Sequence, residues 1–155
     1  PIVFSDEPGM TYYGMLDGQP DWEEFVSSGS GVLPIVCHDP YKYGPEQVVT
    51  GDMEMEVINN GMADVYPFIT AEIKQQEIPY FYVSGFSYIF LAREFVVGDQ
   101  IVINSRRGEI RLNGERDLSF LGLDVDFLPL RRGVNNINVP VGYADVVITW
   151  REVWL

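Results

Sequence analysis

The sequence predicts a mainly β protein whose strands form an antiparallel β-sandwich. Apolar and polar residues alternate along several short segments, as they do in strands with one buried face. Turn residues separate these segments at regular intervals. Helical spacing is confined to two short segments, so helices cannot form a layer of their own.

The chain before residue 46 contains one expected helix between short strands. Strand-like segments occur at residues 2–4, 12–16 and 32–36. Residues 20–27 carry apolar side chains at helical spacing, with Pro20 in the first turn and Gly29 just past the end. We therefore expect a short helix there.

A boundary is expected at residues 39–46, because two prolines and a glycine in this segment break regular structure. The preceding segment is smaller than most autonomous domains. We therefore expect residues 1–46 to be the end of a domain whose first part is missing, and residues 47–155 to form a complete domain.

Residues 47–155 contain the remaining expected strands. Residues 53–57 and 68–74 both alternate apolar and polar side chains. Two hairpins are expected, one pairing 80–83 with 88–91 and the other pairing 101–103 with 110–112. Strands at 136–139 and 144–154 complete the sandwich, and the last buries Val146, Ile148 and Trp150. A single helical turn at 117–121 is capped by Asp117.

The charges are distributed unevenly along the chain. Of 10 basic and 23 acidic residues, the first 73 positions hold one base, Lys42, and 13 acids, which gives a net charge of 1 − 13 = −12. The remaining residues hold 9 bases and 10 acids, for a net charge of −1. This distribution argues against a DNA-binding domain and suits a protein that packs against other proteins beside nucleic acid. The alternative is that the acidity only aids solubility. No apolar segment is long enough for a membrane helix.

Candidate catalytic and metal-binding residues are few, and we expect no catalytic site, no cofactor and no metal. The single cysteine, Cys37, is expected to be a half-buried strand residue, with a reactive thiol as the alternative. The single histidine, His38, is expected in a solvated loop rather than in a catalytic site. Asp124 and Asp126 are potential calcium ligands, but they lack the regularly spaced oxygen donors of an EF-type loop.

Aromatic residues are concentrated between positions 80 and 90. Tyr80, Tyr82, Tyr88 and Phe90 are the candidate site residues, because an exposed sheet face carrying them would stack sugar rings or anchor a protein interface. The alternative is that alternate members of the cluster fill the sandwich core. The segment 104–106, Asn-Ser-Arg, is interpreted as a polar turn and not as a lectin motif.

An ordered series of motifs resembles the C-terminal region of siphophage distal tail proteins. The motifs are GDQIVI at 98–103, EIRLNG at 109–114, DLSFL at 117–121, DFLPL at 126–130, GVNNI at 133–137 and ADVVITWREVWL at 144–155. Upstream, DPYKYGP at 39–45 resembles the link that follows the ring-forming domain of these proteins. Tyr12-Tyr13 with DWEEF at 21–25 resembles the end of that domain.

The resemblance implies a structural protein of the phage tail tip or baseplate. Such proteins form a homo-hexameric ring, with an N-terminal α+β belt domain and a galectin-like C-terminal β-sandwich. On this interpretation, residues 1–46 are the remnant of the belt domain and 47–155 the galectin-like domain. The implied partners are the tail tube protein, the tail-associated hub or lysin protein and the receptor-binding apparatus. The protein would be made in the bacterial host cytoplasm and reside in the virion, encoded by a siphovirus or prophage.

Two other classes of function remain open. One is a carbohydrate-binding module that recognises host cell-surface glycans through the tyrosine-rich cluster. The other is a fragment of a glycoside hydrolase, since a chain with 23 acids can always supply a pair of carboxylates. The leading hypothesis is the tail-tip protein, without enzymatic activity and without specific binding to nucleic acid or membranes.

Overall fold

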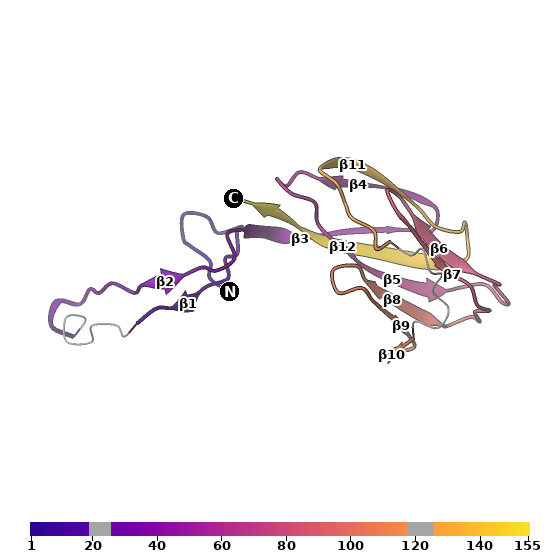
Figure 1. The fold of residues 1–155 in the computed structure, drawn as a ribbon, viewed down its shortest axis with the longest axis horizontal. Helices are drawn as coiled ribbons and strands as arrows, with labels where there is room; N and C mark the ends of the chain where they lie inside the picture. The colour runs from indigo at the N-terminus through magenta and orange to yellow at the C-terminus, as the bar shows by residue number, and fades with distance from the viewer. Residues whose placement is uncertain (19–25, 118–125) are drawn as a thin grey trace. The chain divides into compact units, whose positions relative to one another are not determined.

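The computed structural model describes residues 1–18, 26–117 and 126–155 (Figure 1). Residues 26–28 are helical, and strands are the main regular structure of the described residues. The strands are β1 (Met15–Leu16), β2 (Ile35–Val36), β3 (Lys42–Gly51), β4 (Glu54–Asn59), β5 (Phe68–Ile73), β6 (Phe81–Ser84), β7 (Tyr88–Leu91), β8 (Gln100–Asn104), β9 (Glu109–Leu112), β10 (Glu115–Arg116), β11 (Gly133–Asn138) and β12 (Ala144–Trp154). The predicted fold class, mainly β, is confirmed.

The chain divides into two compact units. The smaller contains Pro1–Pro45 and Val153–Leu155, and the larger is Glu46–Glu152. Two sheets supply the strands of the larger unit, one with six strands in the order β10-β9-β8-β5-β12-β3 and one with four in the order β4-β11-β6-β7 (Figure 1). The pairs β10–β9, β11–β4, β11–β6, β12–β5, β5–β8, β6–β7 and β8–β9 are antiparallel, as expected for an antiparallel sandwich.

The core of the larger unit lies on one face of each sheet, as the alternation of residues predicted. In β4, Met55 and Val57 are buried, whereas Glu54 and Glu56, which alternate with them, are exposed. The central strand β5 places Ile69 opposite Ile148 of β12 on one side and Ile103 of β8 on the other. All three isoleucines are buried, so one inward row runs across three adjacent strands.

The expected break at residues 39–46 is wrong for the second half of that segment. Strand β3 begins at Lys42 and continues through Gly44 and Pro45 to Gly51. Proline cannot donate a ladder hydrogen bond, which excludes it from most central strands. Because β3 is the last strand of the six-stranded sheet, Pro45 lies on an edge where this missing donor is tolerated.

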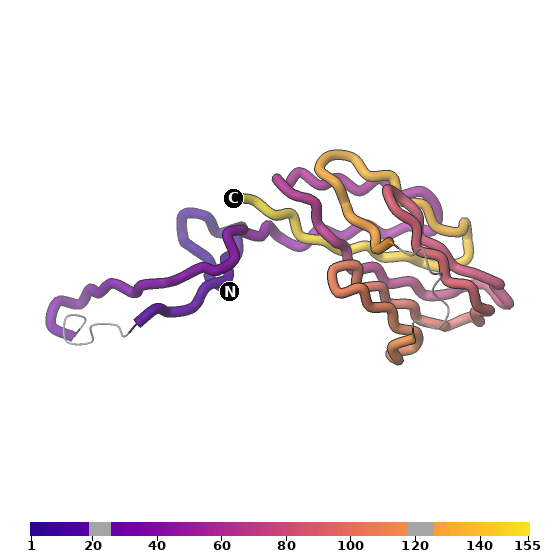
Figure 2. The backbone as a smooth tube through the Cα atoms, viewed as in Figure 1, coloured from indigo at the N-terminus to yellow at the C-terminus, as the bar shows by residue number. Residues whose placement is uncertain are grey.

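The smaller unit contains a short hairpin in which β1 pairs with β2, with Met15 opposite Val36 (Figure 2). The expected strands at 2–4, 12–16 and 32–36 are therefore longer than the observed ones. Ile2 forms only an isolated bridge to Tyr12. The predicted helix at 20–27 lies mostly outside the described residues, and so does the predicted turn at 117–121. No helix in the described part of the chain has the length and apolarity to cross a bilayer.

Candidate interaction surface

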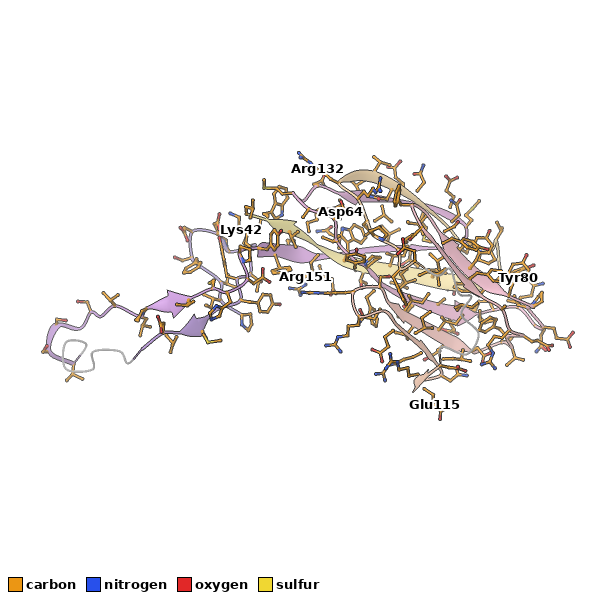
Figure 3. All side chains as sticks on the ribbon, in the orientation of Figure 1. Lys42, Asp64, Tyr80, Glu115, Arg132 and Arg151 are labelled. Carbon is orange, nitrogen blue, oxygen red and sulfur yellow. The ribbon has the colours of Figure 1, made fainter. Side chains whose placement is uncertain are left out.

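The four candidate residues Tyr80, Tyr82, Tyr88 and Phe90 are brought together on the outer face of β6 and β7. The register of this hairpin places Tyr82 opposite Phe90. The alternate residues of the two strands, Phe81, Val83, Ile89 and Leu91, point inward and have no exposed surface. The core-filling alternative therefore describes Phe81 but not the four candidates. Figure 3 shows Tyr80 beside β6 and β7.

The four rings form one connected surface, which we call the four-ring patch. Tyr80 contacts Tyr82 at 6.3 Å and Phe90 at 5.6 Å between ring centroids. Tyr88 contacts Tyr82 and Phe90, each at 5.9 Å. Each ring thus touches two others, and the interplanar angles lie between 16° and 33°. The cross-strand contacts are diagonal ones, which long side chains can span on adjacent strands.

The patch is accessible and polar at its tips. Tyr80 is 36% exposed and Tyr88 is 49% exposed, while Tyr82 and Phe90 are partly buried. None of the three tyrosine hydroxyls shares a hydrogen bond with another described residue. Burial, followed by the neighbouring Tyr82 and Tyr80, raises the pKa of Tyr88 above its ordinary value of 10.0, so its hydroxyl is protonated at neutral pH.

Sequence reasoning missed one member of the surface, Tyr143. Tyr143, between β11 and β12, contacts Tyr80 at 6.4 Å and extends the surface. It lies more than fifty positions from the cluster, and no local pattern marks it. Phe86 belongs to the same stretch of sequence, but it lies in the turn between β6 and β7 under the guanidinium of Arg131.

The residues considered for other chemistry are mostly exposed. His38 lies in an exposed bend. Cys37 is also exposed and follows β2, so the expectation of a half-buried strand residue is wrong. The observed strand ends one residue earlier, at Val36. Asp126 is exposed, and Asp124 lies outside the described residues. Within residues 1–18, 26–117 and 126–155, no three metal-ligating side chains are grouped to hold an ion.

The segment 104–106 forms a turn, as interpreted from the sequence. The Asn104 side chain accepts a hydrogen bond from the backbone N–H of Arg107 at 3.1 Å, immediately after β8. Such side-chain bonds stabilise turns. Ser105 is buried, and its hydroxyl has no hydrogen-bond partner in the described part of the chain.

The smaller unit neutralises the one base of the acidic half. Lys42 Nζ lies 2.7 Å from Glu7 Oε1, and the Tyr12 hydroxyl donates to the other oxygen of Glu7. The hydrogen bonds from Lys42 and Tyr12 lower the pKa of Glu7, and the bond to Glu7 raises the pKa of Lys42. The other carboxylates of this unit therefore have no lysine or arginine of the same unit to offset them.

Residues 60–154 match the family of siphovirus-type tail components, C-terminal domain, and the chain belongs to that family. The resemblance found in the sequence is thereby confirmed.

A particular relative is the distal tail protein of Bacillus phage SPP1. It is 33% identical over 157 aligned residues, which cover 96% of this chain and 61% of the relative. The crystal structure of SPP1 Dit (gp 19.1), described as a paradigm of the hub adsorption apparatus in phages that infect Gram-positive bacteria, has the same fold. It matches with a TM-score of 0.79 and 22% identity, over 100% of this chain and 64% of that one. The chain thus spans less than two thirds of these relatives.

Proposed function

We propose that this protein is a structural subunit of the siphophage tail tip that makes and breaks no covalent bonds. In this role it joins the tail tube to the tail-associated hub or lysin protein and supports the receptor-binding apparatus. It is made in the host cytoplasm and then incorporated into the virion. The family match over residues 60–154 carries this proposal. The 33% identity to a distal tail protein supports it.

The two compact units support the assignment of the two parts of the chain to different domains with different roles. We assign the larger unit to a galectin-like sandwich and the smaller to the end of a ring-forming belt domain. A likeness to galectins would not by itself bring sugar binding, because one fold serves many functions.

The smaller unit exposes apolar side chains that a neighbouring subunit would cover. Its hairpin has two-residue strands, and isolated two-stranded hairpins are marginally stable. Exposed apolar side chains gather on and around this hairpin: Tyr13, Met15, Leu16, Val26, Val32, Leu33 and Ile35. An apolar surface of this kind marks a protein interface. A homo-hexameric ring with repeated contacts between copies would bury it.

The acidic residues of positions 1–46 would then help to line the channel through which viral DNA passes. Like charges keep phosphates from adhering, the opposite of binding by counterion release. Neutralising the Asp and Glu residues of positions 6–24 tests this assignment. We expect slower DNA ejection from particles that carry these substitutions, and unchanged ejection would contradict it.

Light scattering of the purified full-length protein tests the ring. We expect a mass six times that of the subunit and ring-shaped particles in electron micrographs. A matched variant, Leu16→Asp with Leu33→Asp, places charges on the exposed apolar surface of the smaller unit and should yield smaller species. A monomer at every concentration would contradict the proposal.

A further inference from the structure

We propose that the four-ring patch binds neutral sugar rings of a polysaccharide. This inference adds a ligand to the proposed tail-tip protein, and it does not depend on whether the subunits assemble into a hexamer. It rests on the geometry, chemistry and size of the patch.

The patch is built on a rigid support. Phe81 and Leu91 are paired across the hairpin and have no exposed surface, and the same is true of Val83 and Ile89. These inward side chains anchor the two strands that carry the outward rings. Because the rings also pack against one another, little side-chain freedom remains to be lost on binding.

The arrangement of the rings suits the faces of pyranoses. The C–H bonds on one face of a sugar ring carry partial positive charge, and the face of an aromatic ring carries partial negative charge. Neighbouring rings of the patch lie 5.6–6.3 Å apart and are inclined by no more than 33°. Tyr80 and Tyr88 keep 36% and 49% of their surface exposed within this cluster. Sugars of an extended chain could therefore pack against the exposed ring surface of Tyr80 and of Tyr88.

The hydroxyls of the patch suit the same ligand. Three of the four rings are tyrosines whose hydroxyls share no hydrogen bond with the rest of the described chain. A phenolic hydroxyl both donates and accepts. Sugar hydroxyls do the same, whereas an aliphatic side chain would leave these groups unpaired.

Two other occupants fit less well. Sites for single-stranded nucleic acid combine stacking rings with a basic groove. Among the described residues, the cation–π contacts involve Phe86 and Phe95 and none of the four rings. Within that part of the chain, the patch therefore has no basic side chain over its rings, which argues against nucleic acid as the ligand. A stable protein interface buries about 800 Å² per partner. An aromatic side chain presents about 200 Å². Tyr80 and Tyr88 are 36% and 49% exposed and the other two rings less, so the patch exposes on the order of 250 Å². This area is too small for a stable protein interface by itself.

Binding to an array of neutral and charged oligosaccharides tests the proposal. We expect saturable binding to a neutral oligosaccharide of at least two pyranoses. Tyr88→Ala should weaken it about tenfold, because it removes a ring that touches two others. Tyr88→Phe, which keeps the ring, should weaken it less.

Tyr66→Ala is the matched control. Tyr66 is 50% exposed, close to the 49% of Tyr88, and its ring contacts no other aromatic ring of the described residues. The control should bind like the unchanged protein. Absence of binding to any neutral oligosaccharide would overturn the proposal, and so would equal losses in Tyr66→Ala and Tyr88→Ala. If Tyr88→Ala instead lowers the mass measured by light scattering, the patch is a protein interface. The mass of the unchanged protein tests the hexameric ring of subunits separately, so a failure of sugar binding can be told apart from a failure of the proposed assembly.

Discussion

Replacing Asn59 by alanine should destabilise the larger unit by about 3 kcal/mol. Asn59 ends β4 and has no exposed surface. Its amide nitrogen donates to the carbonyls of Ala63 and Leu130, each at 3.0 Å, and its oxygen accepts from the N–H of Gly61 at 3.0 Å. A buried hydrogen bond contributes about 1 kcal/mol, and a buried partner left unsatisfied costs at least as much.

Asn60→Ala is the control for this substitution. Asn60 is exposed, and its side-chain amide donates a hydrogen bond to Glu152 Oε1 at 3.1 Å. Losing this surface contact should cost less than about 0.5 kcal/mol. Urea unfolding followed by fluorescence of the buried Trp150 measures both variants. If the free energies of unfolding of the two variants differ by less than about 0.5 kcal/mol, the hydrogen bonds from Asn59 to Gly61, Ala63 and Leu130 do not stabilise the larger unit.

Two further predictions concern packing and charge. In Gly85→Ala, the added Cβ would lie 2.8 Å from Ile137 Cδ1, so we expect a loss of about 1–3 kcal/mol in urea unfolding. Gly9→Ala, which meets no atom within 4 Å, should have little effect, and equal losses would contradict this packing. NMR titration should place the pKa of Glu7 below 4.5, and Lys42→Met should raise it. Because the folded-state pKa is lowered, the stabilising effect of this pair is present above the unfolded-state pKa and is lost as the pH falls through the folded-state pKa. An unchanged Glu7 titration in Lys42→Met would show that the contact does not form in solution.

Much of the sandwich could be predicted because its strands alternate buried and exposed residues. The segment 68–74 shows this pattern, and it forms the central strand β5 with Ile69, Ala71 and Ile73 buried. The same alternation separated the outward Tyr82 from the inward Phe81 and Val83. Local periodicity was sufficient for these strands because each of them has one face on the core.

The failures of prediction involve contacts that no local pattern records. Pro45 appeared to end regular structure, but the edge position of β3 permits a strand through it. Tyr143 lies next to the four-ring patch only because the chain between β11 and β12 brings it beside Tyr80. In the smaller unit, Cys37 lies one residue past β2 and is exposed, and Ile35 within that strand is exposed as well.

Immunogold labelling of intact phage particles tests the central claim most directly. An antibody raised against residues 46–152 would be applied to virions and viewed by electron microscopy. The proposed function predicts gold at the distal end of the tail, beyond the tube. Gold on the capsid, or particles that carry no label while the unassembled protein is recognised, would contradict it.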